Sequence, residues 1–288
     1  IKNFNPDFIC FSVVTDNYHW SSEIAKLVKK NTKVPIIFVG LQATSCPEEV
    51  IGRDFVDFIV VGEGEYALLE LVENPKKENI KNIWLKKNVK IIKNLLRPLV
   101  NLDSLPFPDK ELFYKEAPYL KDQYMCMTSR GCPFDCSFCF NGHLKDLYKS
   151  QKWFRRLSVE KIINQLKIAK KKFNYNSIRF DDDCFTANKE WLKKFIKEYI
   201  KEINVPFNMA SHSIFIDGEI ATLLKKAGCL LIEIGVQSPI ERIRKDICKR
   251  NDSNKLIINA VKEIKKQGLE LNIDHIFCLP SEKVSDYQ

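Results

Sequence analysis

The feature that most constrains the fold is a regular alternation of short apolar runs with helical patterns after residue 121. Five runs have the length and apolar content of buried strands, and the first four precede stretches with the period of a helix. The runs are "QYMCMTS", "SIRFDDD", "PFNMASHS", "CLLIEIGVQS" and "LELNIDHIFCLP". Repeats of roughly thirty residues in this order predict a β/α barrel. Because a complete barrel needs eight repeats, we expect residues 121–288 to form a partial one.

The front of the chain, residues 1–73, alternates in the same way. The runs "DFICFSVV", "VPIIFVG" and "VDFIVVGEGE" are typical of buried strands, and helical patterns separate them. Apolar strands alternating with helices indicate a parallel sheet covered on both faces. Residues 74–120 are irregular, and we expect a connector there with a short hairpin at "IWLKKNVKII". The predicted class is α/β, with a partial Rossmann-like domain followed by a partial barrel.

Composition and charge disfavour several kinds of protein. The net charge of +9 comes from lysines that follow the solvent faces of predicted helices, so we expect no nucleic-acid partner. No apolar run is long enough to span a membrane. Most of the ten cysteines lack regular spacing, which disfavours a secreted disulfide framework and favours a reducing cytoplasm. Because the chain begins at Ile1 and stops soon after an apolar run, we expect a fragment of a longer protein.

Three cysteines, Cys132, Cys136 and Cys139, crowd into the stretch "RGCPFDCSFCFN" directly after the first barrel strand. Thiolates bind soft metals and iron–sulfur clusters. A [4Fe–4S] cluster held by three cysteines would leave one iron open to a substrate or cofactor. A structural zinc site would need a fourth ligand, which His143 could supply. Three free or buried cysteines would be unusual in a loop flanked by Gly and Pro.

The stretch "CPFDCSFC" resembles the CxxxCxφC signature of radical S-adenosylmethionine (SAM) enzymes, with Phe138 as the aromatic residue. The motifs "FDDDCFT", "LKKAGC", "IEIGVQS" and "IFCLPSE" follow in the order found in that family. The front stretch from "GLQATSCPEEVI" to "GEGEYALLEL" resembles the second half of a cobalamin-binding domain, and "NLDSLPFPDKELF" resembles the usual connector. Together they resemble cobalamin-dependent radical SAM proteins, which include methylases and an anaerobic ring-forming cyclase of chlorophyll synthesis.

This resemblance implies cofactors and a reaction. Cys132, Cys136 and Cys139 would ligate a [4Fe–4S] cluster, SAM would bind its open iron, and cobalamin would bind the front domain. One electron, from a donor such as flavodoxin or ferredoxin, would cleave SAM to methionine and a 5′-deoxyadenosyl radical. That radical would take a hydrogen atom from a small-molecule substrate, and in the methylases methylcobalamin supplies the methyl group. The alternatives are a radical SAM enzyme with a vestigial front domain and a non-catalytic zinc-stabilised scaffold.

The resemblance also assigns parts of the chain. Residues 1–73 would be the C-terminal part of a cobalamin-binding-like domain, residues 74–120 a connector and residues 121–288 a truncated radical SAM core. The residues expected near SAM are Phe138, Asp181, Asp183, Ser211, Glu233, Gln237 and Ser238.

Other interpretations of these polar residues stay open. The three aspartates could form a solvated or helix-capping turn, and Glu233 could be a buried paired charge. Strand alternation places Asp181 and Asp183 on one side and Asp182 on the other. His212 could contact SAM or substrate, or be structural. Arg250 could pair with the SAM carboxylate, although a solvated arginine is favoured.

For cobalamin, the resemblance points to Ser12, Thr15 and Gly40, at the ends of the first two strands. Gly40 would let the backbone approach the nucleotide tail of the corrin, and ordinary strand-end packing is the alternative. The Asp-x-His-x-x-Gly motif of the family is absent from these residues, and His19 is outside any such context. Cys278 also stands where the family usually has Gly, near the adenine of SAM.

Overall fold

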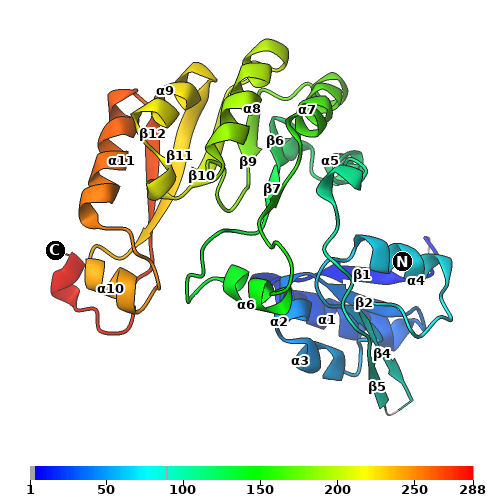
Figure 1. The fold of residues 1–288 in the computed structure, drawn as a ribbon. Helices are drawn as coiled ribbons and strands as arrows, with labels where there is room; N and C mark the ends of the chain where they lie inside the picture. The colour runs from blue at the N-terminus through cyan, green and yellow to red at the C-terminus, as the bar shows by residue number, and fades with distance from the viewer. Residues whose placement is uncertain (1–3, 89, 288) are drawn as a thin grey trace. The chain divides into compact units, whose positions relative to one another are not determined.

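The computed structural model describes residues 4–88 and 90–287 and divides the chain into two compact units. Unit 1 comprises Ile1–Val100 together with Asp146–Gln151, and unit 2 comprises Asn101–Lys145 together with Lys152–Gln288. Figure 1 labels their helices and strands. Within the described ranges, no helix combines the length and the apolar character needed to cross a membrane.

Unit 1 is built on a five-stranded sheet in the order β1-β2-β3-β4-β5. The first three strands are parallel, and the last two pair antiparallel to them. The strands are β1 Ile9–Ser12, β2 Ile36–Val39, β3 Phe58–Val60, β4 Ile83–Lys87 and β5 Lys90–Lys93. The hairpin expected in the connector is therefore present, and it completes the first sheet.

The helices of unit 1 cover both faces of this sheet, as the apolar strands predicted. They are α1 Thr15–Asn31, α2 Leu41–Ser45, α3 Pro47–Gly52 and α4 Glu65–Glu73. Along β2, Ile36 and Phe38 enter one apolar core, whereas Ile37 enters the other. Because successive strand side chains point to opposite faces, one apolar strand contributes to two cores.

The segment Asp146–Gln151 belongs to unit 1, although the chain on either side belongs to unit 2. We call it the strap. Tyr148 in the strap is 2% exposed, and its hydroxyl accepts a hydrogen bond of 3.2 Å from the amide of Glu63. The side chain of Gln151 accepts a bond of 2.7 Å from the amide of Leu99. Two hydrogen bonds thus fasten the strap to the rest of unit 1.

Unit 2 is built on five parallel strands in the order β12-β11-β10-β9-β6, which confirms the predicted series of repeats. The strands are β6 Gln123–Cys126, β9 Ser177–Phe180, β10 Phe207–Ser211, β11 Cys229–Gln237 and β12 Glu270–His275. A short antiparallel pair, β7 Ser129–Arg130 with β8 Arg155–Arg156, follows β6 and frames the cysteine stretch.

Amphipathic helices lie between these strands and flank the sheet (Figure 1). The helices of unit 2 are α5 Glu111–Glu116, α7 Val159–Phe173, α8 Lys189–Glu202, α9 Gly218–Lys226, α10 Glu241–Asp246 and α11 Asn254–Lys266, and α6 Phe140–Leu147 leads into the strap. The predicted N-cap of α7 is confirmed, because Ser158 Oγ accepts a bond of 3.1 Å from the amide of Lys161. Short 3-10 turns occupy Leu102–Ser104, Pro118–Lys121, Ser213–Phe215 and Val284–Tyr287.

The two faces of the unit 2 sheet differ in character. Ile178 and Phe180 of β9, like Ile232 and Ile234 of β11, enter the core formed with the helices. Arg179 and the other residues at alternate positions therefore point to the opposite, free face. They are Arg179, Asp181, Asn208, Ala210, Glu233, Asn272 and Asp274.

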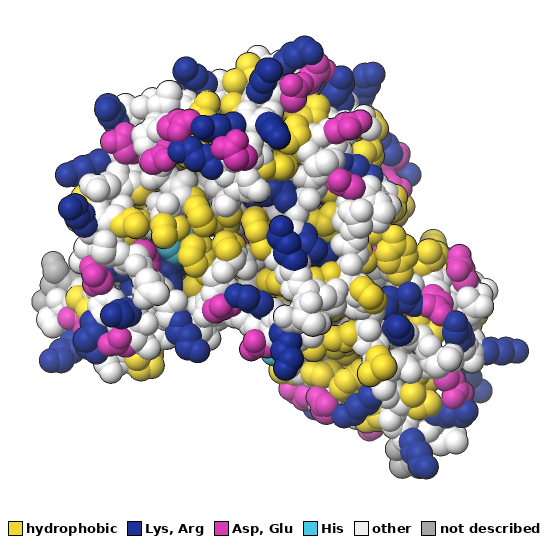
Figure 2. All heavy atoms as spheres, viewed as in Figure 1, with side chains coloured by type: hydrophobic (Ala, Val, Ile, Leu, Met, Phe, Trp, Pro, Cys, Tyr) yellow, Lys and Arg dark blue, Asp and Glu magenta, His cyan; other side chains and the backbone are white. Residues whose placement is uncertain are grey.

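Charged side chains on the helices of unit 2 are mixed in sign. Figure 2 shows Lys and Arg interspersed with Asp and Glu over these helices on the face in view. Lys189 on α8, for example, pairs with Asp217 at 2.9 Å and with Glu219 at 2.7 Å. This mixing agrees with the interpretation of the lysines as solvated helix faces.

Candidate functional site

The three cysteines lie on one loop between β7 and α6, which we call the cysteine loop (residues 131–139). Cys132, Cys136 and Cys139 are free and partly buried. The amide of Cys139 donates a bond of 3.0 Å to the carbonyl of Cys136. Lys145 in α6 pairs with Asp135 at 2.7 Å, and this exposed ion pair links the loop to α6. The loop is therefore a compact turn that carries all three thiols.

The electrostatics of the loop suit a cationic centre. Burial raises the pKa of the Cys132 thiol to about 12, and the neighbouring Cys136 adds to that increase. Burial also raises the pKa of Cys136, which Arg250 opposes and Cys139 reinforces. Thiols in these surroundings become thiolates when a metal supplies positive charge.

The donor chemistry of the loop fits an iron–sulfur cluster. Its three cysteines are free, and thiolates are the ligands that such clusters take. Among the residues that the structure describes, no three His, Cys, Asp or Glu side chains form a group that could hold one metal ion.

The three aspartates after β9 differ in their surroundings, in agreement with the predicted alternation. Asp182 is 1% exposed and accepts bonds from the amide of Thr128 at 2.9 Å, from its hydroxyl at 2.7 Å and from the hydroxyl of Ser129. Burial raises the pKa of this carboxyl, while nearby Arg156 opposes the increase. Asp182 therefore fixes the start of the cysteine stretch to β9.

The other two aspartates remain accessible. Asp181 accepts a bond of 2.8 Å from Arg179 Nε, and Arg179 Nη2 also bonds Glu233 at 3.0 Å. Asp183 is exposed, and the side chain of Asn141 in α6 donates to it. Partial loss of hydration raises the pKa of Asp183. Of the carboxylates predicted near SAM, Asp183 lies closest to the cysteine loop through its contact with Asn141.

The predicted serines at the ends of β10 and β11 have partners within the protein. Ser211 is buried and shares a hydrogen bond with Thr186. Ser238 is buried, donates to Glu282 and accepts a bond of 3.2 Å from the amide of Ile240. Gln237 is partly exposed and Phe138 is 43% exposed. The last two side chains are thus more available to a ligand than the serines.

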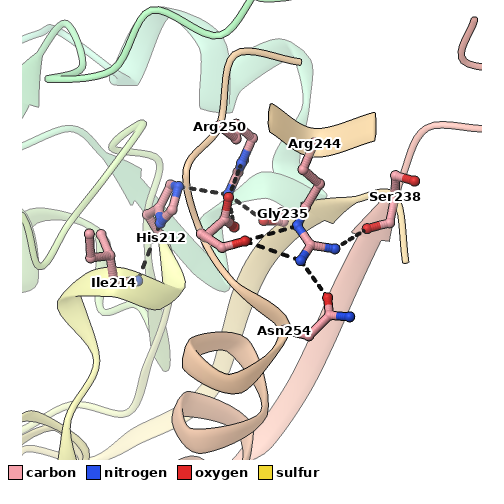
Figure 3. Close-up of polar contacts among 8 residues, drawn as sticks. His212, Ile214, Gly235, Ser238, Arg244, Arg250 and Asn254 are labelled. Atoms are coloured by element: carbon pink, nitrogen blue, oxygen red, sulfur yellow. Dashed lines mark hydrogen bonds and ion pairs between the residues drawn. The ribbon is translucent and has the colours of Figure 1, made fainter. Parts of the chain in front are cut away.

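A buried polar network follows the ends of β10 and β11 (Figure 3). His212 is 7% exposed, and its Nε2 lies 2.7 Å from Arg250 Nη2. Because a guanidinium only donates, the ring nitrogen must accept this bond. Arg250 also donates to the carbonyl of Gly235 at 2.8 Å and pairs with Asp252 at 3.2 Å. The expectation of a solvated Arg250 is wrong, because Arg250 is buried and only 7% of its surface is exposed.

Sequence reasoning missed a second arginine in this network. Arg244 is fully buried and donates to the carbonyl of Ser238 at 2.7 Å and to the carbonyl of Asp252 at 3.1 Å. Its Nη2 also donates to the side chain of Asn254. In the sequence, Arg244 stands in α10 next to apolar Ile243, as a solvent-facing helix arginine often does. No local signal distinguishes it, because all these partners lie in other segments.

In unit 1, the residues predicted for cobalamin lie where β1 and β2 end. Ser12 is exposed, and the hydroxyl of Thr15 donates to Gln42 Oε1 at 3.0 Å. Gly40 has φ of +98°, and a Cβ there would lie 2.7 Å from the carbonyl oxygen of Val13. Close strand-end packing therefore requires glycine at this position, whatever the edge binds.

Two protein-family models match the chain, one at the front and one over the barrel strands. Residues 127–288 match the model of the radical SAM superfamily, and residues 1–72 match the model of the B12 binding domain. The radical SAM match alone covers more than half of the chain.

Two similar proteins are methyltransferases by name. An uncharacterized methyltransferase, PH0819 of Pyrococcus horikoshii, is 31% identical over 98% of this chain and 62% of its own length. Cytidylyl-2-hydroxyethylphosphonate methyltransferase of Streptomyces wedmorensis is 22% identical over 97% of this chain and 59% of its own length. The chain therefore spans about three fifths of these two relatives.

The fold is shared with a solved enzyme of this kind. The cobalamin-dependent SAM radical enzyme OxsB, with aqua-cobalamin and SAM bound, has a TM-score of 0.78 and 21% identity, over 95% of this chain and 41% of OxsB. The α/β architecture, the cysteine loop after the first barrel strand and the two family matches agree with one another. The chain belongs to the radical SAM superfamily, and a B12-binding domain segment precedes its radical SAM domain.

Proposed function

We propose that this chain is part of a cobalamin-dependent radical SAM enzyme that methylates or rearranges an unactivated carbon of a small molecule. The observation that carries the proposal is the cysteine loop, with three neighbouring free thiols directly after β6 and β7. The two methyltransferase relatives favour methyl transfer over rearrangement. The two family matches favour this function over a non-catalytic zinc-stabilised scaffold.

Cys132, Cys136 and Cys139 would hold a [4Fe–4S] cluster. With SAM bound, such a cluster supplies one-electron cleavage of the sulfonium, and a corrin in unit 1 supplies methyl transfer. Asp183, exposed and next to α6, would accept a hydrogen bond from the ammonium group of SAM. Phe138 and Gln237 would contact SAM from the cysteine loop and the end of β11.

Other residues of the chain would orient this site. Asp182 holds the strand that leads into the loop, so that the thiols keep their place relative to β9. Ser211, Glu233 and Ser238, predicted near SAM, would act through the protein contacts that they already make. Ser12, Thr15 and Gly40 would form the edge of unit 1 nearest the corrin. An electron donor such as flavodoxin or ferredoxin, and a cytoplasmic location in which ten cysteines stay free, complete the proposal.

The decisive experiment is anaerobic reconstitution of the full-length protein with iron and sulfide, followed by EPR of the reduced sample with and without SAM. We expect a brown protein whose reduced signal changes when SAM is added. Cys136→Ala should abolish that change, whereas Cys46→Ala, at an exposed thiol of unit 1, should preserve it. A colourless protein that retains one zinc would overturn the proposal.

A further inference from the structure

The residues on either side of Cys136 are fastened to two different parts of unit 2. Two positions before it, the ring of Phe134 stacks on the ring of His212, with centroids 4.2 Å apart and planes at 26°. One position after it, the amide of Ser137 donates to the carbonyl of Cys248 at 3.2 Å, and its hydroxyl donates to the carbonyl of Ile247. Cys136 is thus the cysteine held between two anchors.

The anchor at His212 is itself rigid. The ring is buried at the end of β10, and Arg250 donates to its Nε2 at 2.7 Å. Arg250 is fixed in turn by the carbonyl of Gly235, as Figure 3 shows, and by the carboxylate of Asp252. A continuous set of contacts therefore runs from the cysteine loop through His212 to β11.

Cys139 is held differently from the other two cysteines. Asn141 Nδ2 lies 3.7 Å from the sulfur of Cys139, and Trp153 Nε1 donates to Asn141 Oδ1 at 2.9 Å. Neither contact involves His212, whereas the amide of Phe134 also donates to the sulfur of Cys132. A change at His212 should therefore act on Cys136, and through Phe134 on Cys132, more than on Cys139.

We propose that His212 is a positioning residue for Cys136: its ring supports Phe134 on one side, and Arg250 holds the ring from the other. The inference rests on the proposed function, because the position of Cys136 matters only if the loop binds a cluster. The charge of Arg250 reaches Cys136 in the same arrangement. The network would thus set both the place and the electrostatic field of the middle cysteine.

The test uses the full-length metal-free protein, so that it does not depend on cluster loading. Reduced protein is treated anaerobically with iodoacetamide for short times, and alkylation is located within the tryptic peptide 131–145, which contains the three cysteines. His212→Ala should raise the alkylation rates of Cys136 and Cys132 relative to that of Cys139 by roughly two- to tenfold, the range expected for loss of an aromatic stack.

Matched variants separate the ring from its hydrogen bond. His212→Phe keeps a ring beneath Phe134 and should restore a rate near that of the wild type, whereas His212→Gln keeps an acceptor for Arg250 and should not. His143→Ala, at an exposed histidine four residues after Cys139, is the control and should change nothing. Ser137→Ala, at an exposed side chain, tests the second anchor if His212→Ala does not fold. This variant should also raise the alkylation rate of Cys136.

An equal change at the three cysteines, or none, would overturn the positioning role. Iron loading of the wild-type protein is measured separately. A wild type that takes up no iron while Cys136 responds more than Cys139 to His212→Ala would defeat the proposed function and leave the anchoring intact.

Discussion

Arg179 on β9 reaches past strand β10 to Glu233 on β11, with Nη2 3.0 Å from Oε2. In the register between them, Asn208 pairs with Arg179, and Ala210 pairs with Glu233. Because Ala210 ends at Cβ, little side chain stands between the guanidinium and the carboxylate. Arg179 also pairs with Asp181 at 2.8 Å, so one cation links the end of β9 to β11 across β10.

Arg179→Met should weaken unit 2 by about 1 kcal/mol near neutral pH, the upper range for partly exposed pairs. It would leave Asp181 and Glu233 near Asp274, whose pKa is already raised by desolvation and by the charge of Glu233. Arg179 opposes this increase, so without the cation the pKa of Asp274 rises further, and protonation of Asp274 should relieve the repulsion as the pH falls. The decrease in unfolding free energy caused by Arg179→Met should therefore be smaller at pH 4.5 than at pH 7.5. It is measured by urea unfolding, with hydrogen exchange of β10 as the probe. Lys197→Met on α8 is the control, and equal losses at both pH values would refute this account.

The neighbouring aspartates Asp182 and Asp183 should respond in opposite ways. Asp182→Ala removes the buried carboxylate beside Arg156 and the acceptor of Thr128 and Ser129, so unit 2 should lose about 3–5 kcal/mol. Asp183→Ala should leave thermal unfolding nearly unchanged, because this side chain is exposed. In the reconstituted protein, Asp183→Ala should weaken the change in the EPR signal on addition of SAM. A stable Asp182→Ala variant with a weakened response would reverse the two assignments.

Acid should destabilise unit 2 through His212. Burial and the charge of Arg250 lower the pKa of this ring to about 4. Between its unfolded value near 6.5 and that folded value, the unfolded chain binds a proton that the folded chain does not. Stability is therefore lost as the pH falls through this range, by at most about 3 kcal/mol. His212→Gln should flatten this part of the curve of unfolding free energy against pH, and an unchanged slope would contradict the assignment.

Gly62→Ala should loosen the contact of the strap with unit 1. Gly62 has φ of +83°, and a Cβ there would lie 2.0 Å from the Tyr148 hydroxyl. We expect faster hydrogen exchange in residues 146–151 and around β3. Adding Tyr148→Phe should restore only part of the protection, because the positive φ still costs about 1 kcal/mol or more. Gly52→Ala is the control, since a Cβ there meets nothing within 4 Å. Equal exchange in Gly62→Ala and Gly52→Ala would show that the contact is not tight.

Local sequence patterns predict most of the elements of the fold. The five barrel strands, the N-cap at Ser158 and the alternation of Asp181, Asp182 and Asp183 depend on neighbours in sequence, and the structure agrees with each. The cysteine loop was predictable for the same reason, because its three thiols share one turn.

Features that depend on distant partners were not predictable. Arg250 looked solvated because His212 and Asp252 become its partners only through the fold. The hairpin β4–β5 joined the first sheet through pairing of β4 with β3 across more than twenty residues, which apolar periodicity does not specify. Tyr148 gave no sign of its contact with Glu63, which lies 85 positions away.

The strap gives the chain an interleaved architecture with a consequence for how such domains are exchanged in evolution. A gene segment that ended at Val100 would encode the front sheet without its contacts to Tyr148 and Gln151, which lie beyond the cysteine loop. A recombination event that moved the B12-binding segment onto another barrel would lose these contacts unless the recipient carried an equivalent segment after its third cysteine. The front unit and the loop that follows β7 should therefore be inherited as one block, and compensating changes at Gly62 and Tyr148 should appear together among descendants.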